Sequence, residues 1–302
     1  MRLLVLVLAL LPVFHFPLFC FSLSMSSTDM HSVPVTTLIF DVDDTLYDVS
    51  TGFTAHRNGL GAQRFMVEHL HFPDLATAKQ VRDKYFERYH ATAKALTIAE
   101  QEGAFPPLPD GVVAKTPRFD TQDLSEYWAT KLDFAMLGGK KPQLLQDLKD
   151  CPLNLIAFSN GPRKYVKRVL IEMGLFDVFG EDRLFAVDDV TPACKPEKEA
   201  FDRVLAAVGV SSPEECVMVE DSMKNIRQSR TLGMKTVLVA GKGKLTGQVT
   251  EQSLAAEATK PGDAPIHDDP AVDIAIETIE ELRKAVPSLW DKTNPTFPTK
   301  QR

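Results

Sequence analysis

The chain has 302 residues, of which 44% are hydrophobic and 25% are charged, a composition typical of a soluble enzyme with one sizeable domain and a smaller one. Its net charge of −7 excludes a basic surface, so a nucleic acid polymer is not an expected partner. The four cysteines follow no spacing typical of a zinc site or a CxxC motif, and we interpret them as separate thiols: Cys20, Cys151, Cys194 and Cys216.

The N-terminal segment differs from the rest of the chain. An apolar run over residues 3–21 follows a basic start and precedes small residues, which is typical of a signal peptide. Two prolines and a histidine interrupt the run, so a stable membrane span is not expected. The protein enters the secretory pathway if residues 1–24 act as a signal peptide; otherwise it is cytoplasmic and starts at Met25 or Met30. In either case we expect residues 1–30 to be dispensable for the fold.

The fold is expected to begin near Val35, with an apolar strand that leads into Asp41, Asp43, Asp44 and Thr45. Carboxylates at the carboxyl end of a strand lie where open α/β sheets bind their ligands. Because side chains alternate along a strand, Asp41 and Asp43 would leave it on the same side and share one substrate. With a divalent cation between them, one can stay ionised as a nucleophile while the other carries a proton. The alternative is an acidic surface turn.

A segment of about 100 residues without strand and helix alternation follows, over residues 51–140. Apolar and aromatic residues between positions 78 and 96 recur at steps of three and four, which predicts one amphipathic helix. Further helices are predicted around residues 65–70 and 123–137, with a proline-rich loop over residues 105–117 before the last of them.

Downstream, strands and helices alternate, which predicts a parallel sheet with helices on both faces. The expected strands cover residues 154–158, 184–187, 217–220, 236–239 and 272–276. The expected helices cover residues 163–173, 197–208, 223–232 and 279–285. Residues 241–270 are interpreted as a loop with no assigned chemistry, and residues 291–302 as a loose tail.

Polar residues follow two of these strands and precede one helix. Ser159, Asn160 and Gly161 come after the strand over residues 154–158, and the proline after them suits a helix N-terminus that would favour an anion. An ordinary turn is the alternative interpretation.

Lys195 lies between two prolines before a helix, and Glu220 and Asp221 end the strand over residues 217–220. A lone loop lysine is usually a solvated charge, and Asp221 could serve as a helix cap. Their order along the chain indicates a shared site.

These groups in this order resemble the four motifs of the haloacid dehalogenase superfamily, over about residues 37–290. Within the superfamily, residues 41–47 and residues 271–278 are similar to the pyrimidine 5′-nucleotidase branch. The resemblance implies a Rossmann-like parallel sheet with helices on both faces plus an inserted helical cap. The core would comprise residues 35–50 and 141–290, and the cap, residues 51–140, would close over the site and exclude water.

The resemblance implies a Mg²⁺-dependent phosphomonoester hydrolase. Asp41 would attack phosphorus and form an aspartyl phosphate, and Asp43 would act as general acid and base with a pKa raised by closure of the cap. Mg²⁺ would lie between Asp41, the backbone carbonyl of Asp43 and Asp221, with Glu220 as an outer partner. The expected contacts to the phosphoryl oxygens are Lys195, Ser159, Asn160, Gly161 and Thr45.

The nucleotidase resemblance implies a nucleoside monophosphate such as UMP or CMP. Base contacts would come from the cap, where the candidates are Phe53, Arg57, Arg64, Tyr85 and Tyr89. The chain departs from that branch at His90-Ala91-Thr92 and at residues 130–134, which weakens the base preference. The alternatives are a phosphatase of another small phosphometabolite, a phosphomutase and a non-catalytic binding module. A dehalogenase would not need Asp43.

Overall fold

The structure is a computed structural model that describes residues 34–249, 251 and 263–298. The predicted targeting segment, residues 1–30, lies outside the described residues, and with it the choice between secretion and a later start. In the described part of the chain, no helix combines the length and the apolar character that crossing a membrane requires.

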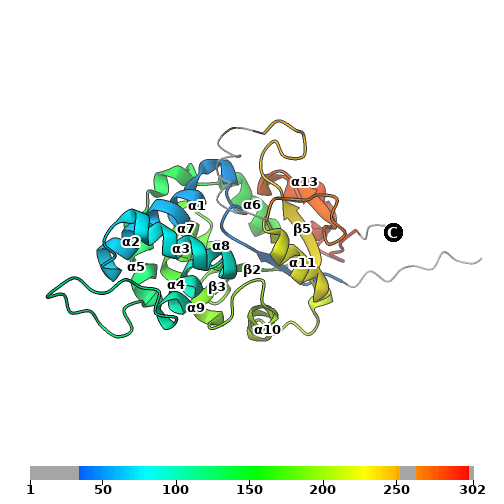
Figure 1. Ribbon diagram of the computed structural model, residues 1–302. Helices are drawn as coiled ribbons and strands as arrows, with labels where there is room; N and C mark the ends of the chain where they lie inside the picture. Colours follow the sequence, from blue (N-terminus) through cyan, green and yellow to red (C-terminus); the bar gives the residue numbers. More distant parts are fainter. Residues whose placement is uncertain (1–33, 250, 252–262, 299–302) are drawn as a thin grey trace, which may run out of the picture. The chain divides into compact units, whose positions relative to one another are not determined.

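Six parallel strands form one sheet in the order β3-β2-β1-β4-β5-β6 (Figure 1). Their bounds are β1 Thr37–Phe40, β2 Asn154–Phe158, β3 Leu184–Phe185, β4 Cys216–Glu220, β5 Lys235–Val239 and β6 Ile274–Ile276. The predicted parallel sheet is therefore confirmed. This strand order is that of the doubly wound Rossmann fold, in which the direction of the strand order reverses between β1 and β4. Ligands of such sheets bind at that point, beyond the carboxyl ends of the strands.

Helices cover both faces of the sheet, as predicted. Leu38 and Phe40 of β1 belong to one apolar cluster with residues of α6, α7 and α13, whereas Ile39 belongs to a second cluster with residues of α10. Because both faces are buried, β1 reads as a continuous apolar run. The helices that follow β1 and the insertion are α6 Pro142–Asp150, α7 Arg163–Glu172, α8 Phe176–Phe179, α9 Val187–Val190, α10 Lys198–Ala207, α11 Met223–Thr231 and α13 Leu282–Ala285.

The segment over residues 51–140, called the insertion below, is helical. Its helices lie together in Figure 1: α1 Phe53–His56, the π-helical turn Arg57–Gly61, α2 Ala62–Leu70, α3 Leu75–Tyr89, α4 Thr92–Gln101 and α5 Thr121–Lys131. The described residues all fall within one compact unit, so the proposed boundaries between core and cap stay predictions.

The prediction of one continuous helix between residues 78 and 96 is wrong. α3 ends at Tyr89, and His90 takes a left-handed conformation with φ of 53° before α4 begins. Apolar residues that suggested one continuous face instead form a contact between two helices, since Tyr85 clusters with Ala95 and Ala99. The spacing of apolar residues continues across the break at His90 because α3 and α4 each bury one side against the other.

The end of the described chain is packed. Residues 291–298, predicted to be a loose tail, place Phe297 in the core at 2% exposure. The carbonyl of Pro295 accepts a hydrogen bond from the backbone N–H of Val35 at 3.2 Å.

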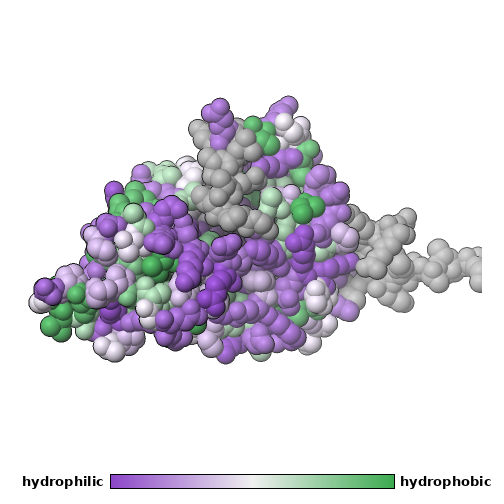
Figure 2. All heavy atoms as spheres, viewed as in Figure 1, coloured by the Kyte–Doolittle hydropathy of each residue, from purple (hydrophilic) through white to green (hydrophobic). Residues whose placement is uncertain are grey.

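In the view of Figure 2, the surface over α3 and α11 is largely hydrophilic, so these helices turn their polar sides outward on that face.

Candidate active site

A sharp turn after β1 places the first pair of carboxylates. The backbone N–H of Asp41 still bonds to the Val219 carbonyl of β4 at 2.9 Å, and the chain then leaves the sheet. Asp44 adopts a left-handed φ of 58°, which aspartate tolerates better than most residues with a side chain. Asp41 and Asp43 both line a cavity of about 470 Å³ at this end of the sheet.

Three carboxylates from β1 and β4 come together in this cavity. Ligand oxygens of Asp41, Glu220 and Asp221 lie within 4.8 Å of one another. Burial raises the pKa of Asp41 to about 6, and burial and the adjacent Asp41 raise the pKa of Glu220 well above its usual range. A divalent cation would relieve this crowding of negative charge, and oxygen ligands are those that Mg²⁺ prefers. The residues present therefore fit the expected metal.

Glu220 differs from the other two carboxylates in how fully it is bonded. Its Oε2 accepts hydrogen bonds from Lys195 Nζ at 2.8 Å and from Asn225 Nδ2 at 3.0 Å. Its Oε1 accepts from the backbone N–H groups of Asp221 and Ser222, at 3.2 and 3.1 Å. Glu220 is thus the weaker candidate ligand of the three, and it orients the turn that carries Asp221.

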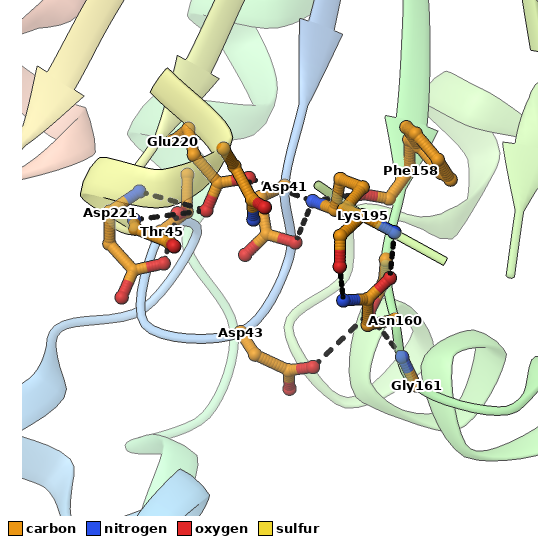
Figure 3. A network of polar contacts seen from close by, with 12 residues as sticks. Asp41, Asp43, Thr45, Phe158, Asn160, Gly161, Lys195, Glu220 and Asp221 are labelled. Atoms are coloured by element: carbon orange, nitrogen blue, oxygen red, sulfur yellow. Dashed lines mark hydrogen bonds and ion pairs between the residues drawn. The ribbon is translucent and has the colours of Figure 1, made fainter. Parts of the chain in front are cut away.

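Lys195 links the two strands that carry the acids. Its Nζ is buried and donates to Asp41 Oδ1 at 2.6 Å, to Glu220 Oε2 at 2.8 Å and to the Phe158 carbonyl at 2.8 Å (Figure 3). Burial alone lowers the pKa of Lys195, but the two carboxylates raise it above its usual value. The side-chain amide of Asn160 exchanges two hydrogen bonds of 2.8 Å with the Lys195 backbone. Asn160 therefore positions the loop that carries the lysine.

Asp43 lies in a different environment and points away from Glu220 and Asp221 (Figure 3). It accepts hydrogen bonds from four side chains: Arg57 Nη1 at 2.5 Å, Tyr165 Oη at 2.5 Å, Tyr47 Oη at 2.7 Å and Ser159 Oγ at 3.1 Å. Burial raises the pKa of Asp43, but Arg57 and the two tyrosine hydroxyls outweigh it and lower that pKa overall. The prediction that the surroundings raise the Asp43 pKa is wrong for this arrangement, because Arg57 and the hydroxyls stabilise the ionised carboxylate.

Three residues predicted to contact phosphoryl oxygens do not line the cavity. The Ser159 hydroxyl is fully buried, donates to Asp43 and accepts from the Gly161 N–H at 2.9 Å. Thr45 donates to Asp221 Oδ1 at 3.4 Å. A Cβ at Gly161 would lie 2.9 Å from the Tyr165 ring, so a glycine here allows the turn to approach that ring. Of the five predicted contacts, Lys195 and Asn160 line the cavity.

Most of the residues that were predicted to contact a base also lie outside the cavity. Arg57 lines the cavity, but the other four candidates do not. Phe53 is buried in a cluster of aromatic rings, and the Tyr85 hydroxyl donates to Glu102 at 2.7 Å. Arg64 is exposed, and the ring of Tyr89 lies next to the Arg88 guanidinium. Among the described residues, the aromatic side chains that do line the cavity are Phe86 and His90.

Sequence reasoning missed several residues of this site. Tyr47 could have been suspected, because it stands four residues after Asp43 in the same turn, but Tyr165 offers no comparable signal. The loop over residues 241–270, to which no chemistry was assigned, contributes Asp263 to the cavity wall. Asp263 accepts hydrogen bonds from Ser222 Oγ at 2.6 Å and from the Lys224 N–H at 3.1 Å.

Two family models match the sequence of this chain. The model of the haloacid dehalogenase-like hydrolase family matches residues 35–228, and a related HAD-hydrolase-like model matches residues 192–269.

Several solved structures resemble the chain at low sequence identity. The L-2-haloacid dehalogenase from Xanthobacter autotrophicus is 19% identical, over 84% of this chain and 98% of its own, with a TM-score of 0.48. A HAD phosphatase from Thermococcus onnurineus is 20% identical, over 83% and 97%, with a TM-score of 0.47. The HAD-hydrolase YfnB from Bacillus subtilis, determined bound to magnesium, is 21% identical, over 83% and 98%, with a TM-score of 0.46. Because the family model covers more than half of the sequence, the chain belongs to the haloacid dehalogenase-like hydrolases.

Proposed function

We propose that this hydrolase cleaves phosphomonoesters with Mg²⁺ and that Asp41 is its nucleophile. The observation that carries the proposal is the position of Asp41, which lines the cavity, pairs with Lys195 at 2.6 Å and lies within 4.8 Å of Glu220 and Asp221. A phosphate dianion is repelled by bare carboxylates. Lysine and a metal beside the nucleophile offset that repulsion.

The proposed reaction has two halves. In the first, an Asp41 oxygen bonds to phosphorus as the ester P–O bond breaks, and the leaving oxygen takes up a proton. In the second, water attacks the aspartyl phosphate, loses a proton and releases inorganic phosphate, which restores Asp41. Mg²⁺ held by Asp41, Asp221 and the Asp43 carbonyl would neutralise charge on the phosphoryl oxygens.

Asp43 is our candidate for the proton transfers. In the structure its carboxylate is held in the ionised form by Arg57, Tyr47 and Tyr165, which suits a general base for the attacking water. To protonate the leaving oxygen in the first half, Asp43 must first gain a proton. We infer that this requires the Arg57 guanidinium to move off Asp43 when a substrate binds.

The same nucleophile could serve other reactions of this family. A halide leaves without a proton, so a dehalogenase would have no use for Asp43 and its four donors. A phosphomutase would return the phosphoryl group to the substrate, and it would yield an isomeric phosphate in place of inorganic phosphate. Product analysis separates all three.

The finer assignment, a pyrimidine nucleoside monophosphate, rests on the sequence of residues 41–47 and 271–278. If it holds, UMP and CMP are hydrolysed with a higher kcat/KM than AMP and GMP. The cavity wall supplies the rings of Phe86 and His90, and the Arg82 guanidinium already lies over the Phe86 ring at 4.0 Å from its centroid. Equal kcat/KM on all four nucleotides would reject the assignment and leave a phosphatase of another metabolite.

The test of the proposed function is phosphate release from p-nitrophenyl phosphate and these nucleotides, with and without Mg²⁺. We expect Asp41→Asn to abolish release, because an amide keeps the shape of the side chain but does not attack phosphorus. Asp110→Asn, at an exposed aspartate outside the cavity, is the matched control and should retain activity. Normal turnover by Asp41→Asn would exclude the covalent mechanism, and no phosphate release from any of these esters would exclude the phosphatase.

A further inference from the structure

Helix α3 of the insertion places a buried guanidinium in the cavity wall. Arg82 is 6% exposed and lines the same cavity as Asp41 and Lys195. Its Nη1 donates to Asp83 Oδ1 at 2.8 Å. Its Nε and Nη2 are buried and have no hydrogen-bond partner in the part of the chain that the structure describes. Arg82 therefore lines the cavity and has two donors without a partner among the described residues.

The charge of Arg82 is compensated by one ion pair and by the Phe86 ring, whose centroid lies 4.0 Å from the guanidinium carbon. Asp83, its ion-pair partner, is 40% exposed at the side chain and is shared with Lys79. Burial lowers the pKa of Arg82 below its usual value, and nearby Arg57 lowers it further. A buried charge with unsatisfied donors is unfavourable unless something pairs with it. Retaining such a group at a cavity wall points to a partner that enters the cavity.

Arg57 and Arg82 differ in which of their hydrogen-bond donors have partners. Both arginines are buried and line the cavity, but Arg57 Nη1 binds Asp43 at 2.5 Å and its Nε binds Asn58 Oδ1 at 3.2 Å. The edge of Arg82 that lacks partners consists of Nε and Nη2. These two groups carry parallel N–H bonds, the fork that grips a carboxylate or phosphate with two hydrogen bonds.

The reacting phosphoryl group does not require Arg82. At the strand ends, Lys195 and the metal expected at Asp41 and Asp221 supply positive charge to it. Around Arg82, the cavity is lined by side chains of α3 that include two further cations, Lys79 and Lys84, and two acids, Asp83 and Glu87. The anion that fits Arg82 is thus a second one.

We propose that the substrate is a phosphomonoester with a second anionic group, a carboxylate or a second phosphate, which the Nε and Nη2 edge of Arg82 binds. This inference rests on the proposed function and narrows its substrate class. Nucleoside monophosphates with an uncharged base lack such a group, so the inference predicts a different order of substrates from the nucleotidase assignment.

Three series of synthetic substrates test it. The first contains alkyl phosphates with two to five carbons, the second the corresponding ω-carboxyalkyl phosphates, and the third the α,ω-alkanediol bisphosphates. At the chain length that spans the cavity, we expect a second anion to raise kcat/KM about 10- to 100-fold over the alkyl phosphate, as for hydrogen bonds to a charged group. The series with the larger ratio identifies carboxylate or phosphate as the group that is bound.

Substitutions assign the preference to Arg82. In Arg82→Met, which keeps an unbranched apolar stem but no charge, the ratio should fall close to one, and in Arg82→Lys it should be intermediate because the fork is lost. Arg88→Met is the matched control on the same helix. Arg88 pairs with Glu102 outside the cavity, so this variant should keep the wild-type ratio. Since the ratio is measured within each variant, a general loss of activity does not imitate the effect.

The inference and the proposed function fail in different ways. Equal kcat/KM for all three series, or a ratio unchanged in both Arg82 variants, overturns the inference and leaves the phosphatase intact. If no ester is hydrolysed, the proposed function fails, and calorimetry with ω-carboxyalkyl phosphonates decides the inference. Binding tighter than that of alkyl phosphonates, and lost in Arg82→Met or Arg82→Lys, supports it; equal binding overturns it.

Discussion

On the side of the cavity that the sheet provides, Lys195 donates three hydrogen bonds, and Asn160 fixes its backbone. We call this side the core wall, formed by Asp41, Asn160, Lys195, Glu220 and Asp221. On the insertion wall, formed by Arg57, Lys79, Arg82, Lys84 and Phe86, Arg82 donates one hydrogen bond to Asp83 and leaves two donors without a partner among the described residues.

The two walls differ in where their charged side chains find hydrogen-bond and ion-pair partners. On the core wall, Lys195 forms ion pairs with Asp41 and Glu220, which holds the nucleophile in place before any ligand arrives. The insertion wall has an incomplete set of pairs, which a substrate can complete. Substitutions in the core wall should therefore affect turnover most, whereas the preference between substrates should follow the insertion wall.

The largest effect is expected from removal of the metal. Chelation should abolish turnover, and Mg²⁺ should restore it and also raise Tm, because it relieves the repulsion among Asp41, Glu220 and Asp221. At a hundredfold excess over Kd, binding stabilises the folded state by about 2.7 kcal/mol. Calorimetric melting of the wild type and of Asp221→Asn checks this. A rise in Tm of the same size in both proteins would place the ion elsewhere.

Lys195→Ala comes next. We expect a loss of about 10² to 10³ in kcat, as for one preorganised transition-state donor. Two buried carboxylates also lose their partner, which should lower the free energy of unfolding by about 3–5 kcal/mol. Because a cation takes over part of that charge, the destabilisation should be smaller with Mg²⁺ than with a chelator. Denaturation in urea under both conditions measures it. Near-normal turnover would show that Lys195 is not part of the catalytic site.

Tyr165→Phe probes the group of donors around Asp43. The ring stays in contact with Trp128 and Phe53, but the hydroxyl that bonds to Asp43 at 2.5 Å is lost. A hydrogen bond to a charged group contributes about 1.5–3 kcal/mol, so the free energy of unfolding should fall by that amount. Urea denaturation measures the change. An unaltered stability would show that the remaining donors to Asp43 suffice.

Tyr85→Phe should have the smallest effect. Its hydroxyl bonds to Glu102, which is largely exposed, and the side chain does not line the cavity. We therefore expect unchanged KM for every substrate and a smaller loss of stability than in Tyr165→Phe. Steady-state kinetics on the two variants side by side tests this. A raised KM in Tyr85→Phe would show that Tyr85 contacts the substrate, as expected from the resemblance to nucleotidases.

The amino-acid sequence by itself determined the sheet and the positions of its acids. Apolar runs that end in Asp41, in Ser159 and in Glu220 are local patterns, and parallel strands bring their carboxyl ends to one edge. That is why the gathering of Asp41, Glu220 and Asp221 could be predicted from residues far apart in the chain, whereas Lys195 follows no strand and its place in the site was implied by the family resemblance.

Tertiary structure alone decided which groups surround Asp43 and Arg82. The donors to Asp43 include Arg57 and Tyr165, which come from separate helices and meet through packing that no local pattern encodes. The break at His90 was likewise hidden, because two packed helices show the same apolar spacing as one long helix. Hydrogen bonds between side chains depend on angles between elements, which spacing along a sequence does not specify. For this reason the kinds of reactive groups were predictable, but the lowered Asp43 pKa and the two unused donors of Arg82 were not.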